Sequence, residues 1–452
     1  MVLRNEERWG SGSAVRAQPG TGPRNIASHR LKAAAKENGG LTGVKRIIVS
    51  VIILFVVLPI LAGCGGGSKE DKPANKEVKS YDLRAESARF GFGLFRQVAS
   101  QDSGSNVVLS PVSAKLALAM AYNGAVGETE EAMAGVLDLE GMSLEEANEQ
   151  LSNLMTSLAQ ADEDVLLEIA DSLWADEGYV FQEDFVQRCR DFYAAEVANL
   201  DLQDPGTVER INAWVSENTH DKIKKITDRI DPAVVLMLIN AVYFNGKWHT
   251  PFDPSLTADG EFQRLDGGTV SVPFMHRSGD FSYFENEDLQ AVNLPYGEGR
   301  MSMYVVLPRE GSDHGAFLQG LDENVWQAWI NGLQDREGEL ALPRFRVEYE
   351  KVLNDALTAM GMGPAFVGGF TGMVAQESDE ELFISTVLQK TYIDVNEEGT
   401  EAAAVTSIEM EATAAMPAEE PFEMIVDRPF FFAIRDNQTG ALLFMGSIVD
   451  PS

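Results

Sequence analysis

Residues 400–411, TEAAAVTSIEME, alternate with a period of two between positions that carry no charge and positions that hold every acid. The uncharged set is Thr400, Ala402, Ala404, Thr406, Ile408 and Met410. The interleaved set is Glu401, Ala403, Val405, Ser407, Glu409 and Glu411. Such alternation is typical of a strand with one face in a core and one in water. The next residues, ATAAMPAEEP, have no core-forming pattern and indicate an exposed loop. The segment is therefore suited to two states, a loop and a strand.

The run 234–248, VVLMLINAVYFNGKW, is apolar over most of its length and rich in β-branched and aromatic residues, with Asn240 in its middle. It predicts a strand that is buried on both faces. Further strands are expected at 302–308, 339–349, 428–434 and 441–449. Helices are expected at 85–101, 204–226 and 351–362. Another helix should follow Ser110-Pro111 and break near Gly124 and Gly127. Helices crowd the first half and strands the second, so the pattern predicts an α+β fold in one large domain, 83–452.

Charge changes the list of possible partners. The chain of 452 residues carries a formal net charge of −34, which argues against nucleic acid because a phosphate backbone requires a basic face. A soluble acidic surface that resists aggregation accounts for this charge.

The first 82 residues differ from the rest of the chain. Lys45 and Arg46 precede an apolar run from Ile47 to Ile60, which is followed by Leu61-Ala62-Gly63-Cys64. This order predicts an export signal, and LAGC resembles the lipobox of bacterial lipoproteins, which implies that Cys64 is lipidated and becomes the mature N-terminus. The alternative is an ordinary signal peptide or a signal anchor.

The N-terminal region and the domain divide into four segments. We interpret 1–43 as an extension outside the natural protein, with Val44 as the true start, 44–63 as the lipoprotein signal peptide and 64–82 as a flexible tether that leads into the domain. The domain would then lie outside the cytoplasm, attached to the membrane of a bacterial cell envelope through lipid on Cys64. Cys189 is left alone, so no disulfide is available within the mature domain, and a packed thiol is expected.

Four stretches in this order resemble the serpin superfamily of serine protease inhibitors. They are NVVLSPVSAKLALAMAYNGAVGETEEAM at 106–133, LINAVYFNGKWHTPFDP at 238–254, IDVNEEGTEAAAVT at 393–406 and DRPFFFAIRDNQTGALLFMGSIVDP at 427–451. The resemblance implies an α+β fold with three β-sheets, about nine helices and an exposed reactive loop. It also implies a suicide-substrate inhibitor of serine endopeptidases, in which the cleaved loop inserts into the main sheet as a new strand.

The resemblance makes the alternation at 400–411 the entry end of the inserting strand. Its hinge residues are Glu397, Glu398, Gly399, Thr400, Glu401, Ala402, Ala403 and Ala404. Small uncharged side chains at 400, 402 and 404 can enter a packed sheet, whereas a charged or bulky one would stall entry.

Family spacing places the reactive bond fourteen residues after Gly399, at Thr413–Ala414, and Met410 and Met416 remain alternatives because the following connection is longer than usual. An inserted strand of that length reaches ~45 Å at ~3.3 Å per residue. No Lys or Arg lies between Thr391 and Asp427. This favours elastase-like or subtilisin-like serine proteases, disfavours trypsin-like ones, and leaves a cysteine protease open.

The resemblance also assigns residues that control opening of the main sheet. They are Ser110, Ser113, Asn240, Gln389 and Trp248, the last at the point where the loop enters. Gln389 stands where the family commonly has a histidine, so a pH-dependent switch at that residue is not expected. Each of these side chains is equally compatible with plain core packing.

Two other classes of protein fit the sequence less well. None of the five histidines sits in an HExxH motif, and the sequence has no GxSxG or SxxK motif and no metal-ligand spacing, so neither an enzyme nor a metal or other cofactor is predicted. A non-inhibitory serpin, acting as a carrier or surface-binding protein, is the alternative function; its members commonly have unsuitable hinge residues, and this hinge is suitable. A monomer is expected.

Overall fold

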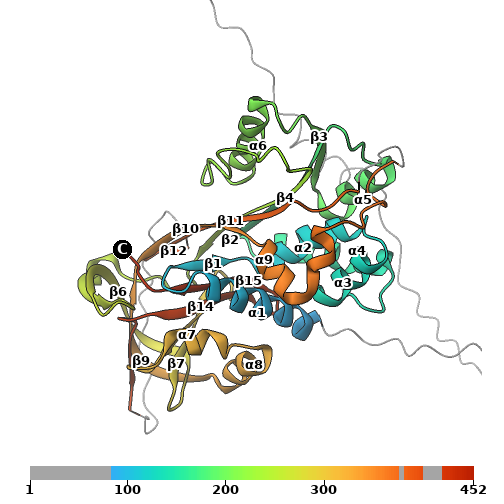
Figure 1. The fold of residues 1–452 in the computed structure, drawn as a ribbon. Helices are drawn as coiled ribbons and strands as arrows, with labels where there is room; N and C mark the ends of the chain where they lie inside the picture. The colour runs from blue at the N-terminus through green and yellow to red at the C-terminus, as the bar shows by residue number, and fades with distance from the viewer. Residues whose placement is uncertain (1–82, 376–380, 401–419) are drawn as a thin grey trace, which may run out of the picture. The chain divides into compact units, whose positions relative to one another are not determined.

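The computed structural model describes residues 83–375, 381–400 and 420–452 (Figure 1). The predicted extension, signal peptide, tether and lipidated Cys64 lie outside these residues, as do Glu401 to Ala404 and the predicted reactive bond Thr413–Ala414. The α+β prediction is confirmed, with nine α-helices among the described residues. They are α1 Leu83–Gln101, α2 Pro111–Tyr122, α3 Glu128–Val136, α4 Leu144–Ala159, α5 Glu183–Tyr193, α6 Pro205–Asn218, α7 His314–Gln319, α8 Glu323–Gly332 and α9 Asn354–Leu357.

The main sheet has six strands in the order β10-β11-β12-β4-β2-β3. Their bounds are β2 Val165–Asp176, β3 Glu196–Leu200, β4 Leu236–Lys247, β10 Phe345–Val352, β11 Thr386–Val395 and β12 Gly399–Thr400. The predicted apolar run forms β4, which is buried on both faces from Leu236 to Phe244. β4 pairs in parallel with β11 from Met237 to Tyr243. We call this β4–β11 pairing the seam.

The remaining strands form one continuous hydrogen-bonded path, β1-β15-β14-β8-β7-β6-β9-β13, with β5 paired to β6. Their bounds are β1 Val107–Leu109, β5 Ala258–Gln263, β6 Thr269–Glu285, β7 Leu289–Tyr296, β8 Met301–Pro308, β9 Gln334–Pro343, β13 Phe422–Ile425, β14 Phe430–Asp436 and β15 Leu442–Ile448. Three separate sheets were expected. The 17-residue β6 joins two of them because it pairs with β5 and β9 over its length and with β7 at its end.

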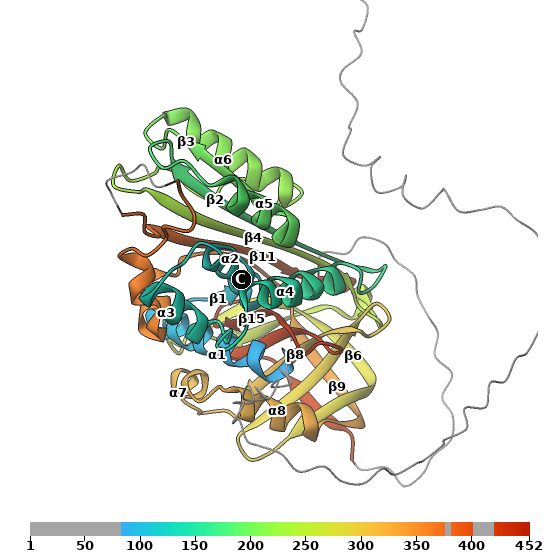
Figure 2. The same cartoon turned by 90° about the vertical axis from the view of Figure 1, so that its right-hand side faces the viewer.

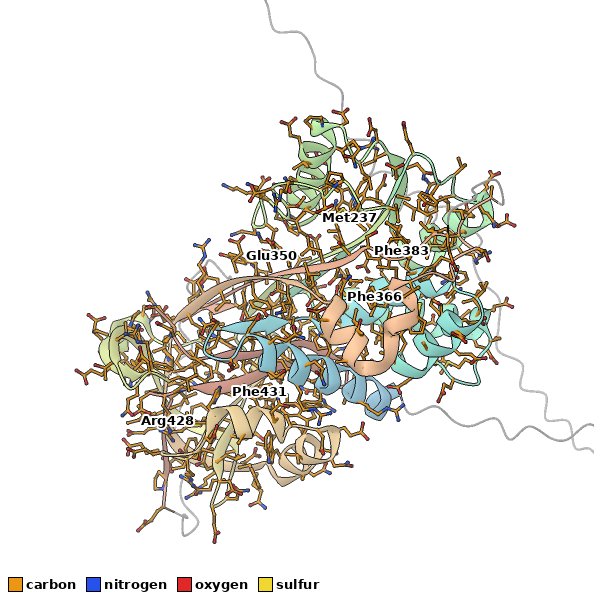
Figure 3. The ribbon with its side chains drawn as sticks, viewed as in Figure 1. Met237, Glu350, Phe366, Phe383, Arg428 and Phe431 are labelled. Carbon is orange, nitrogen blue, oxygen red and sulfur yellow. The ribbon has the colours of Figure 1, made fainter. Side chains whose placement is uncertain are left out.

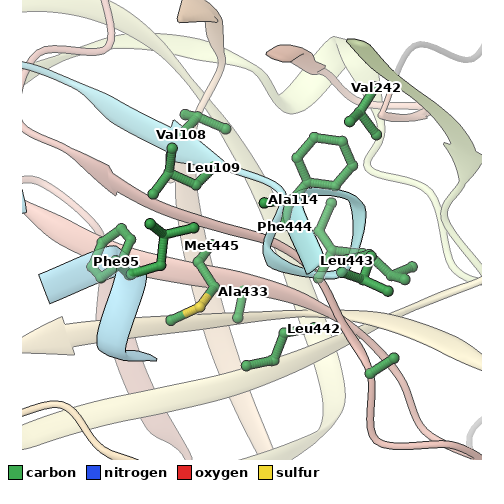
Figure 4. Packing of buried hydrophobic residues seen from close by; sticks show 14 of the residues in the cluster. Phe95, Val108, Leu109, Ala114, Val242, Ala433, Leu442, Leu443, Phe444 and Met445 are labelled. Carbon is green, nitrogen blue, oxygen red and sulfur yellow. The ribbon is translucent and has the colours of Figure 1, made fainter. Parts of the chain in front are cut away.

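The core occupies both faces of the main sheet. Figures 1 and 2 show α6 on the outer face and α2, β1 and β15 on the inner face. Met237 of β4 belongs to the smaller cluster with Ile211 and Val215 of α6, whereas Phe431 of β14 lies in the larger cluster (Figure 3). In that larger cluster, Val242 of β4, Ala114 of α2 and Phe444 of β15 lie close together (Figure 4).

Local sequence accounts for the boundaries of α6. Asp204 caps α6 by accepting a hydrogen bond from the Gly206 amide, and Pro205 occupies the first turn, as predicted. The helix predicted over 204–226 is too long, since α6 ends at Asn218. His220 and Asp221 then take positive φ angles of 49° and 60°, which a helix cannot continue.

The helix predicted over 351–362 was also placed too broadly. β10 extends to Val352, and only Asn354–Leu357 is α-helical before the short helical turns Thr358–Met362 (η3) and Gly363–Phe366 (η4). Gly361 has a φ of 115° and interrupts the helix. A further short turn, η2, covers Pro254–Leu256.

Candidate functional site: the hinge and the seam

The first two residues after the hinge glutamates already lie within the main sheet. Gly399 and Thr400 form β12, which pairs antiparallel with β4 at Lys247 and Gly246 and with β11 at Val395. β12 therefore separates β4 from β11 at one end of the seam, while the two strands remain directly paired over the rest of it.

Glycine is required at position 399 by the closeness of β4. A Cβ atom there would lie 2.0 Å from the carbonyl oxygen of Gly246 and 2.8 Å from Cα of Lys247. Both are backbone atoms of a paired strand, which cannot move away without breaking the pairing. The predicted hinge glycine thus permits the tight approach of β12 to β4.

Thr400 is completely buried, and its Oγ1 lies 2.7 Å from the hydroxyl of Tyr296. Burial raises the pKa of Tyr296 far above its usual value, so this hydroxyl keeps its proton. The Tyr296 ring stacks on Trp248 with centroids 4.4 Å apart and an angle of 12° between the rings. Sequence reasoning singled out Thr400 and Trp248 but missed Tyr296, which belongs to β7.

Trp248 also holds the chain that leads into β12. Its indole Nε1 donates to the Asn396 carbonyl at 2.9 Å, and its backbone amide donates to the Glu398 carbonyl at 2.9 Å. The structure therefore places Trp248 beside the residues that lead into β12.

Glu397 is buried and bonds to Arg344, which connects β9 to β10. Its buried carboxylate accepts hydrogen bonds from Nε and Nη2 of Arg344 and from the hydroxyl of Thr257, with 2.7 Å between Arg344 Nε and Oε1. Burial by itself would raise the pKa of Glu397, but the hydrogen bonds from Arg344 and Thr257 bring it below its usual value. The ionised glutamate thus fixes the start of the hinge.

A cluster of buried polar side chains lies at the middle of the seam. Asp171 of β2, Asn240 of β4 and Gln389 of β11 are register partners in one row across three strands. Asn240 Nδ2 donates to Asp171 Oδ1 at 2.6 Å and to the hydroxyl of Ser113, while Gln389 Nε2 donates to Asn240 Oδ1 at 2.6 Å. These bonds join both sides of the seam to α2.

Ser110 takes part through its backbone. Its amide donates to Gln389 Oε1 at 3.0 Å and its carbonyl accepts from Gln389 Nε2 at 3.0 Å, whereas its hydroxyl has no partner among the described residues. Ser110, Ser113, Asn240 and Gln389 are thus brought together as the resemblance implied, and separating β11 from β4 would break the Asn240–Gln389 bond.

Asp171 was missed because its strand was not singled out. The signal was present in LEIADSLWAD, where an acid stands between small residues inside a largely apolar segment. Such an acid in a strand indicates a buried carboxyl with specific partners.

The described residues thus form a main sheet in which the two-residue β12 lies between β4 and β11 at one end of the seam. The chain belongs to the serpin family: the family model described as serpin (serine protease inhibitor) matches residues 85–451. An uncharacterized serpin-like protein of Thermococcus kodakarensis is 35% identical over 89% of this chain and 99% of its own. Human neuroserpin is 31% identical over 80% of this chain and 90% of its own.

Solved structures share the fold. The native state of tengpin, a thermophilic serpin, superposes with a TM-score of 0.75 at 33% identity, covering 83% of this chain and 95% of the tengpin chain. A thyroxine-binding globulin in complex with thyroxine superposes with a TM-score of 0.74 at 25% identity, covering 82% and 100%. The family therefore supports a protease-inhibitor type of fold, and a thyroxine-binding protein shares that fold.

Two further properties concern the described residues only. None of the helices within 83–375, 381–400 and 420–452 is long and apolar enough to cross a membrane. Within the same ranges, no group of three or more His, Cys, Asp or Glu side chains could hold a metal ion.

Proposed function

We propose that this protein inhibits serine endopeptidases by suicide-substrate trapping. The single observation that carries the proposal is β12, since two residues of the future strand already separate β4 from β11 at the end of the seam. The alternation from Thr400 to Glu411 supports it, because continued entry would place uncharged side chains in the core and Glu401 outside. On this proposal the protein forms a trapped complex and does not act as an enzyme.

The proposal extends to the target and the location. The absence of Lys and Arg between Thr391 and Asp427 favours an elastase-like or subtilisin-like target, with Thr413–Ala414 as the reactive bond. We further propose that lipid on Cys64 anchors a monomeric inhibitor to the outer side of a bacterial membrane. Mass analysis of the N-terminal peptide tests the anchor, because an unmodified Cys64 or peptides from 1–43 would contradict it.

The decisive experiment mixes the full chain, solubilised in detergent, with elastase-like and subtilisin-like proteases. We expect a protease adduct that survives a denaturing gel, together with a released C-terminal peptide that begins at Ala414. A trypsin-like protease is the matched comparison and is expected to give no adduct. Cleavage without an adduct by every protease tested would remove the inhibitory function.

A carrier function is the second candidate, because a thyroxine-binding globulin shares the fold. The two functions differ after the loop is cut. Insertion adds a complete central strand and should raise the melting temperature strongly, whereas a carrier that does not insert its loop should melt at an unchanged temperature.

A further inference from the structure

Asp171 is the titratable member of the polar row under the seam. Its neighbours in the row, Asn240 and Gln389, carry amides that do not titrate near neutral pH. The Asp171 side chain is 2% exposed; Oδ1 accepts from Asn240, and Oδ2 has no hydrogen-bond partner among the described residues. A buried carboxylate with one oxygen that no protein group partners is costly when it is ionised.

The position of Asp171 couples this cost to the seam. The side-chain amide nitrogen of Asn240 donates hydrogen bonds to Asp171 and to Ser113. The side-chain oxygen of Asn240 accepts a hydrogen bond from Gln389 on the other side of the seam. When β11 separates from β4, the Asn240–Gln389 bond breaks and water can reach the row. Hydration by that water stabilises an ionised Asp171 more than a protonated one.

We infer that Asp171 makes opening of the seam depend on its proton: the protonated carboxyl favours the closed sheet, and its ionisation favours separation of β4 from β11. The consequence for inhibition, faster loop insertion above neutral pH, rests on the proposed function. The pH dependence of seam opening does not rest on the proposed function, because it concerns the sheet before any loop inserts.

The direction follows from linkage. Burial raises the pKa of Asp171 to about 7, and the hydrogen bond from Asn240 offsets some of the rise. Opening admits water and returns the pKa toward its ordinary value, so opening releases a proton and becomes easier as pH rises. The dependence ends above the closed-state pKa, where Asp171 is ionised in both states.

Other charged or titratable groups lie on the elements packed around Asp171. They include Lys115 on α2, Arg188, Cys189 and Tyr193 on α5, and Glu196 on β3. Burial raises the pKa of Cys189 to about 12, and burial, with Asp171 as a minor contributor, also raises the pKa of Tyr193 well above its usual value. Neither group therefore changes its charge between about pH 5 and pH 9, which leaves Asp171 as the member of the row that titrates there.

The test measures opening directly by hydrogen–deuterium exchange of the full chain in detergent. The amides of β4 and β11 along the seam are followed from about pH 5.5 to pH 8.5, and each rate is divided by the intrinsic exchange rate at that pH. The ratio of the two rates measures how often the seam opens, and we call it the corrected opening. If opening lowers the pKa of Asp171 by about one unit, the corrected opening is expected to increase about tenfold and to level off above pH 7.

Asp171→Asn keeps the size of the side chain and removes the titration, so its corrected opening should be the same at every pH. Asp171→Ala is a second neutral variant in case the first folds poorly. Glu196→Gln, on the adjacent strand opposite Ser172, is the matched control and should retain the wild-type profile. A flat wild-type profile, or a pH dependence that survives in the Asp171 variants, would overturn the inference.

A second readout separates this inference from the proposed function. A synthetic peptide of residues 400–413 with its three glutamates replaced by glutamine carries no side-chain charge, and tryptophan fluorescence follows its insertion into the sheet. Faster insertion at high pH in the wild type but not in Asp171→Asn supports both proposals. Exchange that depends on pH without any peptide insertion would leave the inference standing and contradict the inhibitory function.

Discussion

The hydroxyl groups of Tyr296 and Thr400 lie 2.7 Å apart inside the protein, although 104 residues separate them in the chain. This contact ties the first uncharged residue of the alternating segment to a strand outside the main sheet. Because the Tyr296 ring stacks on Trp248, the same contact links β12 to the tryptophan that bonds the preceding residues Asn396 and Glu398. This buried hydrogen bond and this stacked pair add to the bonds that Trp248, Arg344 and Thr257 make to the hinge.

Tyr296→Phe should loosen this hold without removing the stack. Loss of the hydroxyl leaves Thr400 Oγ1 buried without its partner, which costs about 1 kcal/mol of unfolding free energy. We expect a lower melting temperature and faster proteolysis of the loop. Tyr304→Phe is the control, since it removes a hydroxyl that bonds Asn437 away from the hinge; equal proteolysis in the two variants would contradict the role of Tyr296.

On the proposed function, Thr400→Arg should lead to cleavage of the protein in place of trapping of the protease. The arginine would have to enter a fully buried position between β4 and β11, which adds an uncompensated charge to the core. The number of inhibitor molecules cleaved per trapped protease is expected to rise at least severalfold. Glu401→Arg is the matched comparison, because the alternation directs position 401 outward, and it should trap protease with nearly wild-type efficiency.

Arg344→Gln should destabilise the hinge at neutral pH but not at low pH. The substitution removes the cation that holds Glu397 ionised, at a cost of about 1–3 kcal/mol for a charged hydrogen bond. Since the folded-state pKa of Glu397 is lowered, its contribution to stability is present above the ordinary glutamate pKa and is lost as pH falls through the folded-state value.

Melting temperatures of Arg344→Gln and the wild type, measured from about pH 3 to pH 8, test this sign. The difference between the two proteins should be largest at neutral pH and should shrink below about pH 4. A constant difference across the range would show that Arg344 acts through packing alone.

Cys189 should resist thiol reagents as long as the protein is folded. Its side chain is fully buried in α5, and burial raises the pKa to about 12, so almost no thiolate is present at neutral pH. In a Cys64→Ser variant, labelling is expected only after denaturant unfolds the domain. Rapid labelling of the native protein would mean that α5 opens readily.

Local chemistry determined several features of this protein from the sequence. The α+β class, the doubly buried β4, the Asp204-Pro205 start of α6 and the break between α2 and α3 follow from interactions among residues close in the chain. The alternation of small uncharged side chains after Gly399 could be predicted for the same reason, because strand alternation is a property of consecutive residues.

Only the tertiary structure decided which distant residues meet. Strand register brings Asp171 to Asn240 across 69 residues and Gln389 to Asn240 across 149, and no local pattern specifies that register. The same is true of Tyr296 with Thr400 and of the bonds that Ser110 makes through its backbone rather than its hydroxyl. The joining of two sheets by β6 likewise depends on pairing between strands that lie apart in the chain. Residue spacing sets each element, whereas burial of its faces against other elements sets where its side chains lie.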